Sequence, residues 1–172
     1  IPKAIENGIA YATEDRKQFG LILGNDVKTN ITLANLEGIA PGGIVSPPKE
    51  VAVANDYRDQ LQIKTPSVRQ LAVNLSGGNQ QKVTIGRWIT GGVRTFLFFD
   101  PTRGIDIRTK REIYQLVRDL AAAGGAVLLY TSELGEIQAA CDRVVTVFNG
   151  RIVDERPAAG ADEPTLMRAA YA

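Results

Sequence analysis

Residues 75–82, Leu-Ser-Gly-Gly-Asn-Gln-Gln-Lys, are the stretch of this chain best suited to hold an anion. Gly77 and Gly78 let the backbone approach a ligand closely, and Ser76 offers a hydroxyl group. The following residues, 83–89, can continue as a helix, whose first amides would point outward with partial positive charge. The stretch therefore predicts an anion-binding loop. An ordinary turn before a helix is the alternative interpretation.

Apolar patterns elsewhere predict the elements that would position this loop. Continuous apolar runs at residues 96–99 and 126–130 predict strands buried on both faces of a parallel sheet, and a shorter strand is expected at 8–12. Between the two runs, residues 113–120 carry apolar side chains at i, i+3, i+4 and i+7, which is typical of an amphipathic helix, and glycines at 124–125 end it. This alternation predicts an α/β fold with right-handed crossovers.

The middle of the chain has the pattern of a mainly helical region. A helix is expected at residues 25–36 with Asn25 or Asp26 as its cap, and a second helix is expected at 49–63. Glycine and proline pairs make 38–48 a loop between them. We expect this helical region to present the anion-binding loop.

The end of the chain should form a hairpin followed by a helix. Asn-Gly between the apolar runs 144–148 and 151–153 is a hairpin signal. Cys141 is expected on the apolar face of a short helix, as a core residue and not as a nucleophile. A last helix at 162–171 should turn Met167 inward.

Composition narrows the classes of function. The 172 residues carry 20 Lys and Arg against 19 Asp and Glu, so no bulk charge attracts the chain to nucleic acid. There is no histidine, the commonest general base and metal ligand, and a single cysteine excludes an internal disulfide. This cysteine usage favours a cytosolic compartment. No apolar run reaches the roughly 18 residues of a membrane span and no signal-peptide layout occurs, so we expect any connection to a membrane to pass through a partner.

The stretch at 75–82 resembles the signature motif of ABC-type ATPases, in the sequence variant typical of monosaccharide-import subunits. In that family the motif contacts the γ-phosphate of an ATP that the opposite nucleotide-binding domain holds. The resemblance therefore implies that ATP is contacted by Ser76, Gly77, Gly78, Asn79 and Gln80.

Other segments resemble further parts of the same family, in the family's order. They are a Q-loop at 13–17 with Glu14, a Walker B strand at 96–102, a D-loop with Gly104, Ile105 and Asp106, and the switch position at Ser132. The resemblance covers essentially the whole chain. It implies a partial P-loop NTPase core with parallel strands plus a mainly helical signature subdomain, divided as 1–24, 25–90 and 91–172.

Departures from the family pattern bear on the chemistry. No Gly-x-x-x-x-Gly-Lys-[Ser/Thr] occurs, so the phosphate cradle is missing from these residues. In an ungapped alignment Phe99 stands at the Mg²⁺-binding aspartate and Asp100 at the catalytic glutamate. With one residue deleted, Asp100 becomes the metal ligand and no catalytic carboxylate remains. Asp100 is thus the only catalytic candidate, and no metal ligand is assigned. Ser132 cannot be a cationic phosphate contact, and a helix N-cap is its alternative role.

The resemblance implies an ATP-binding component of a bacterial ABC importer for simple sugars, namely the C-terminal nucleotide-binding domain without its Walker A segment. ATP and Mg²⁺ are the expected cofactors of the assembled transporter, with none bound tightly by this part alone. The expected partners are a second nucleotide-binding domain, transmembrane permease subunits and, indirectly, a periplasmic or extracellular sugar-binding protein. The protein would be peripheral on the inner face of the cell membrane. The sugar, and whether this chain is itself an enzyme, stay open.

Two other classes of protein are possible interpretations of the same residues. A non-hydrolysing structural or regulatory module would keep the fold and the pairing surface while losing chemistry, which Phe99 permits. An ABC ATPase of DNA repair would carry a coiled-coil insertion and a basic face, and the sequence has neither.

Overall fold

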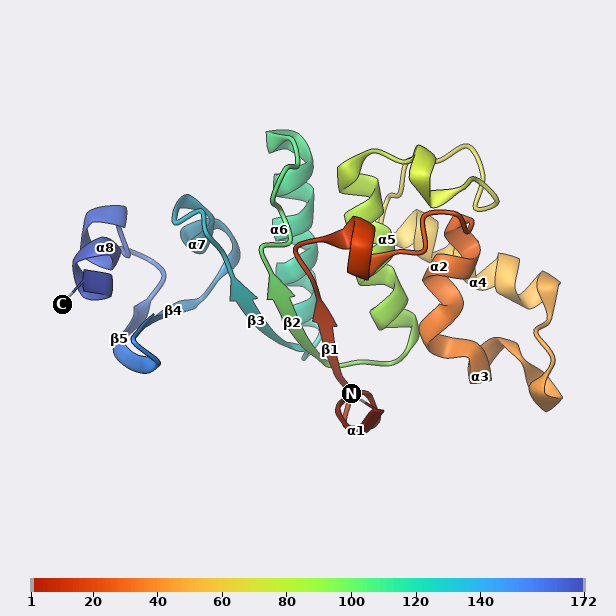
Figure 1. The fold of residues 1–172 in the computed structure, drawn as a ribbon, viewed down its shortest axis with the longest axis horizontal. Coiled ribbons are helices and arrows are strands. Elements are labelled where there is room, and N and C mark those ends of the chain that lie inside the picture. The colour runs from red at the N-terminus through yellow and green to blue at the C-terminus, as the bar shows by residue number, and fades with distance from the viewer. Residues whose placement is uncertain (1, 172) are drawn as a thin grey trace.

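The computed structural model describes residues 2–171 and is built around a three-stranded parallel sheet (Figure 1). The sheet has the order β1-β2-β3, with β1 at Ile9–Ala12, β2 at Thr95–Phe99 and β3 at Ala126–Tyr130. Phe96 of β2 lies opposite Ala10 of β1 and Val127 of β3. The predicted α/β class with parallel strands is confirmed.

Helices cover one face of this sheet. Helix α5 (Gly77–Thr90) precedes β2, and α6 (Ile107–Ala122) connects β2 to β3. The inward side chains Phe96 and Phe98 form a core with Ile85 of α5 and with Ile113 and Val117 of α6. As predicted, α6 is amphipathic, and it ends shortly before the two glycines at 124–125.

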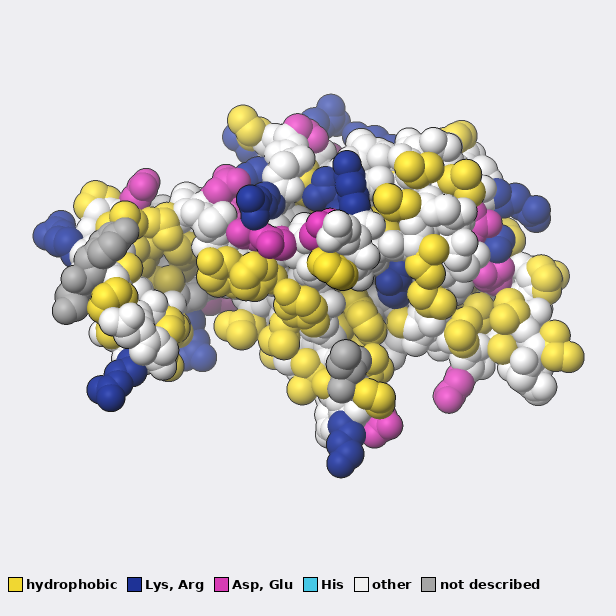
Figure 2. All heavy atoms as spheres, viewed as in Figure 1, with side chains coloured by type: hydrophobic (Ala, Val, Ile, Leu, Met, Phe, Trp, Pro, Cys, Tyr) yellow, Lys and Arg dark blue, Asp and Glu magenta, His cyan; other side chains and the backbone are white. Residues whose placement is uncertain are grey.

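The opposite face of the sheet is open. Tyr11, Leu128 and Tyr130 are 54%, 67% and 52% exposed, and Figure 2 shows hydrophobic side chains gathered over β1–β3. The prediction of burial on both faces is therefore wrong for β3, whose outward side chains are exposed, and for β2, whose outward side chains are only half-buried. The reason is that among residues 2–171 the helices pack only against the side of Phe96 and Phe98.

The middle of the chain forms a group of helices beside the sheet (Figure 1). The first predicted helix is α2 (Val27–Thr32), a 3₁₀ turn (Leu33–Asn35) and α3 (Leu36–Ile39). Asp26 caps α2 by accepting the Thr29 N–H at 2.9 Å. The second is α4 (Pro47–Gln60), which begins earlier than predicted because proline suits the first helical position.

These helices enclose a second core that also reaches α5. Its buried members are Leu21, Val27, Ile31, Leu61, Ile63, Leu75 and Val83. Because α5 contributes to both cores, the signature-like loop at its start is fixed to the sheet and to the helical group. The division at residues 24 and 90 stays a prediction.

The C-terminal part is a hairpin with two helices. β4 (Arg143–Phe148) and β5 (Arg151–Pro157) pair antiparallel across Asn149 and Gly150, which both have positive φ, as the Asn-Gly signal predicts. Helices α7 (Gly135–Ala140) and α8 (Glu163–Tyr171) pack nearby, and α1 (Pro2–Glu6) lies at the other end of the chain. The prediction for Met167 is wrong. Met167 is 42% exposed, and Leu166 points inward instead, since the buried face of α8 is one residue out of the expected phase.

Within residues 2–171, no helix combines the length and the apolar character that crossing a bilayer requires.

Candidate functional site

The signature-like loop is the N-terminal cap of α5. The Ser76 hydroxyl accepts hydrogen bonds from the Asn79 side-chain amide at 2.9 Å and from the Asn79 backbone N–H at 3.5 Å. The Asn79 side-chain oxygen accepts the Lys64 N–H at 2.8 Å, which ties the loop to the helical group. Ser76 is exposed and Asn79 is half-buried. The loop thus presents a hydroxyl beside the outward amides of a 14-residue helix.

Gln80 has a different environment from Ser76. Its side chain is buried, and its amide donates to the Ala72 carbonyl at 3.0 Å while the amide oxygen has no partner among the described residues. Gln80 therefore supports the loop from behind. A contact from Gln80 to a ligand would require the side chain to leave this position.

Both glycines of the loop lie close to neighbours within the chain; the neighbour of Gly78 is a short, branched side chain, whereas that of Gly77 is the mobile end of an arginine. A Cβ at Gly78 would lie 2.1 Å from Cγ2 of Thr109, in the first turn of α6. A Cβ at Gly77 would lie 2.4 Å from Nη2 of Arg16. Sequence reasoning assigned these glycines to close approach by a ligand and missed Thr109 and Arg16. No local sequence signal indicates either contact, because each joins segments far apart in the chain.

The Q-loop-like and D-loop-like segments meet at the surface. Glu14 accepts a charged hydrogen bond from Arg103 at 2.8 Å, and the Arg16 guanidinium donates to the Arg103 carbonyl at 3.3 Å. The Asp15 carboxylate caps a π-helical turn, Arg16–Gly20, by accepting the backbone N–H groups of Lys17 and Gln18. These residues and Lys17 line a hollow of about 310 Å³. Burial lowers the pKa of Arg16, and Asp15 opposes that effect.

The D-loop-like residues have structural tasks in this arrangement. Gly104 adopts a positive φ of 68°, Ile105 is buried, and Asp106 caps α6. Asp106 accepts the Thr109 N–H at 3.0 Å and the Thr109 hydroxyl at 2.8 Å. These hydrogen bonds from Thr109 lower the pKa of Asp106.

Asp100 and Ser132, the residue at the switch-like position, are in direct contact. The Asp100 carboxylate accepts the Ser132 N–H at 2.7 Å and the Ser132 hydroxyl at 3.1 Å. Asp100 is buried and has a φ of 45°, a strained conformation for a residue with a side chain. The alternative role of Ser132 as a helix cap is wrong, since the cap residue of α7 is Leu134.

Phe99 lies next to this pair but has no polar role. Its ring stacks on Tyr130, with 4.2 Å between the ring centroids and 8° between the planes. Within residues 2–171 no cluster of three or more His, Cys, Asp or Glu side chains is placed to hold a metal ion.

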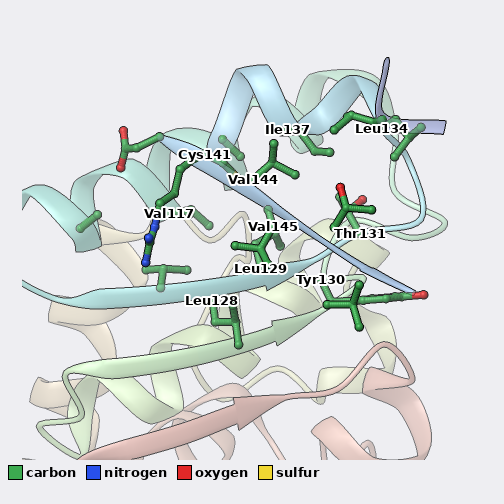
Figure 3. A pocket seen from close by; sticks show the side chains of 18 of the residues that line it. Val117, Leu128, Leu129, Tyr130, Thr131, Leu134, Ile137, Cys141, Val144 and Val145 are labelled. Atoms are coloured by element: carbon green, nitrogen blue, oxygen red, sulfur yellow. The ribbon is translucent and has the colours of Figure 1, made fainter. Parts of the chain in front are cut away.

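A hollow of about 580 Å³ lies between β3 and β4 (Figure 3). It is lined mainly by apolar side chains, among them Leu129, Ile137 and Val144. Cys141 also lines it, and burial, with Asp142 nearby, raises the pKa of this thiol, which favours the unreactive form. No residue that the sequence predicts for a site lines this hollow.

Comparisons with known proteins decide the family. No protein-family model matches the chain. It is 46% identical over 168 residues to an L-arabinose transport ATP-binding protein of Geobacillus stearothermophilus, and 42% identical over 164 residues to a xylose import ATP-binding protein of Thermoanaerobacter pseudethanolicus. These alignments cover 98% and 95% of this chain. The chain matches one part of ABC ATP-binding subunits, and the names of these relatives give arabinose, xylose or ribose as the transported sugar.

The chain spans about a third of the length of these relatives, 33% and 32% for the two named. A solved nucleotide-free ATP-binding cassette from an ABC transporter has the same fold, with a TM-score of 0.71 and 18% identity, over 99% of this chain and 67% of that one.

Two of the predicted features do not meet directly, although Arg103 lies between them: its N–H donates to the Asp100 carbonyl at 3.1 Å, and its carbonyl accepts from Arg16. The first is the loop at Ser76, which contacts α6 and Arg16 through its glycines. The second is the pair Asp100 and Ser132. No hydrogen bond among the described residues joins Ser76 to Asp100.

Proposed function

We propose that this chain supplies the signature motif, Ser76 to Gln80, to a composite ATP site in a bacterial importer of simple sugars. The observation that carries the proposal is the start of α5, where an exposed serine hydroxyl stands beside helix amides with partial positive charge. The loop is tied to its surroundings through Asn79 and Gln80. Such a loop suits a phosphate group that another domain brings to it.

The proposal includes the rest of the transporter. ATP and Mg²⁺ would be bound mainly by the P-loop of a second nucleotide-binding domain, and Mg²⁺ would neutralise charge on the transferred phosphoryl group. The other partners would be transmembrane permease subunits and a sugar-binding protein outside the membrane. The protein would then lie on the cytoplasmic face of the membrane. The proposal assigns Ser76 and Asp100 to two different ATP sites.

Two substitutions in the assembled transporter test this function. Ser76→Arg places a bulky cation where the phosphate must dock, so most of the steady-state ATPase activity should be lost. Ser76→Ala, which removes the cap without adding bulk, should lose less. Asp100→Asn should remove only a small share, because the site built on that strand lacks one of its two acids. If Asp100→Asn is as damaging as Ser76→Arg, the division between two sites is wrong.

A non-hydrolysing module is the second candidate, and a specific observation favours it. Phe99 is stacked on Tyr130, and the carboxylate of the adjacent Asp100 is bonded to Ser132. If ATPase activity of the assembled transporter does not change in Ser76→Arg, the chain is such a module and the composite site is refuted.

A further inference from the structure

Glu136, the second residue of α7, places a carboxylate inside the protein. The residue is only 3% exposed. A buried carboxylate is unfavourable unless hydrogen bonds and an opposite charge compensate for the lost water. None of the ABC-like motifs includes Glu136, so the reason for its burial has to be sought in the side chains around it.

Side chains from three segments bind this carboxylate. The hydroxyl of Thr102 donates to Oε1 at 2.6 Å, and the hydroxyl of Thr131 donates to Oε2 at 2.8 Å. The Lys110 ammonium lies 3.2 Å from Oε1. Burial works to raise the pKa of Glu136, but hydrogen bonds from Thr102, Tyr114 and Thr131 outweigh it and hold that pKa below its ordinary value. Glu136 is thus an ionised, fully engaged group.

The two threonines flank the contact between Asp100 and Ser132. Thr102 lies two residues after Asp100, in the turn that follows β2. Thr131 directly precedes Ser132, in the segment that follows β3. One carboxylate therefore bridges the same two segments that the bond from Ser132 to Asp100 joins.

We propose that Glu136 is a positioning residue that fixes the segment after β2 against the segment after β3 and so sets the place of the Asp100 carboxylate. Without the bridge, the two segments are joined by the Ser132 contact and by the hydrogen bond from the Asp100 N–H to the Tyr130 carbonyl at 2.9 Å, and the strained backbone of Asp100 loses a restraint. The consequence for ATP turnover rests on the proposed function, whereas the positioning itself does not.

Glu133 provides a matched control. It lies in the segment after β3 and also pairs with Lys110, but its side chain is 54% exposed and bonds neither Thr102 nor Thr131. Only the backbone of Glu133 contacts the Thr131 hydroxyl, and a change of side chain leaves that backbone in place. Glu133→Gln therefore removes a charge and a Lys110 partner while leaving the bridge in place. Glu136→Gln removes a charge of the same kind at the bridge.

The test measures hydrogen exchange of the Ser132 amide by NMR in the protein that contains these residues. Ser132 is an exposed residue, so its amide is protected chiefly by the Asp100 carboxylate. Glu136→Gln should speed its exchange about tenfold, as expected for a charged hydrogen bond that is lost or weakened. Glu133→Gln should change it by less than about twofold. Amides of α5 should exchange as in the wild type in both variants.

Unchanged Ser132 exchange in Glu136→Gln overturns the proposal. Equal acceleration at Ser132 and throughout α5 also overturns it, because that result indicates general destabilisation. If Glu136→Gln fails to fold, Thr102→Val and Thr102→Ser decide the matter from the opposite segment. Thr102→Val removes the hydroxyl and should accelerate Ser132 exchange, whereas Thr102→Ser keeps the hydroxyl and should restore protection. No difference between these two variants refutes the bridge.

An ATPase measurement on the assembled transporter distinguishes this inference from the proposed function. Glu136→Gln should lower kcat and leave the KM for ATP unchanged. The activity that it loses should be the same part of the ATPase activity that Asp100→Asn removes. Faster Ser132 exchange with unchanged kcat supports the positioning and counts against a catalytic role of Asp100.

Discussion

Replacing Gly78 with alanine should destabilise the protein by a clash with α6, whether or not nucleotide is bound. The added Cβ would lie 2.1 Å from Cγ2 and 3.0 Å from Cβ of Thr109. Thr109 cannot rotate away at no cost, because its hydroxyl is bonded to Asp106 at 2.8 Å. The variant must therefore separate α5 from α6 or break part of the cap of α6.

The expected loss can be bounded. Overpacking costs about 1–3 kcal/mol of unfolding free energy, and a weakened cap adds about 1 kcal/mol. Alanine offsets up to about 1 kcal/mol of this through its higher helix propensity, and less in a first turn such as that of Gly78. A net destabilisation of about 1–3 kcal/mol remains.

Urea unfolding of the 172-residue chain, followed by the fluorescence of its single tryptophan, Trp88, measures this loss. Gly135→Ala is the control, because a Cβ there meets nothing within 4 Å; it should be neutral or stabilising by about 0.4–1 kcal/mol. Adding Thr109→Ser to Gly78→Ala removes Cγ2, the nearest atom, and should recover part of the stability. Wild-type stability of Gly78→Ala, or no recovery in the double variant, would refute the argument.

Three further outcomes are expected. The 172-residue chain should self-associate through the open face of its sheet, and Leu128→Lys should make it monodisperse in light scattering across a concentration series; a monomeric wild type at all concentrations contradicts this. The chain alone should not bind Mg-ATP tightly, because it has no Gly-x-x-x-x-Gly-Lys-[Ser/Thr] loop, and micromolar binding in calorimetric titration would disprove that expectation. The pKa of Glu136 is lowered in the folded state, so ionised Glu136 adds to the free energy of unfolding above the unfolded pKa of about 4.3, and this contribution is lost as pH falls through the folded pKa. Below about pH 4.3 the free energy of unfolding of Glu136→Gln should therefore depend less steeply on pH than that of the wild type, as acid unfolding would measure.

Sequence patterns predicted the helices and strands well where each element depends on residues close together in the chain. Continuous apolar runs gave the parallel strands, the i, i+3, i+4, i+7 pattern gave α6, and Asn-Gly gave the hairpin. They failed where the outcome depends on packing. Whether both faces of β2 and β3 are buried depends on what covers them, and an apolar run is the same in either case. The buried position in α8 is Leu166 and not Met167, since a short helix leaves its phase undetermined.

The candidate site was predictable only in its motifs. Ser76, Asp100 and Ser132 stand out by residue type and by position after predicted elements. Glu136 does not, because the residues that make it important, Thr102 and Thr131, reach it through the fold. The same holds for the pairs that confine the two glycines of the loop.

The contact between Gly78 and Thr109 has a consequence for how such sequences evolve. A relative that has stopped binding nucleotide would still be selected against losing this glycine, because the joint between α5 and α6 requires it. Substitution at position 78 should become acceptable only after position 109 has become smaller, so the two positions should change together. Retention of Gly78 in a diverging lineage is then a record of helix packing, and it says less about surviving ATP turnover than the exposed Ser76 does.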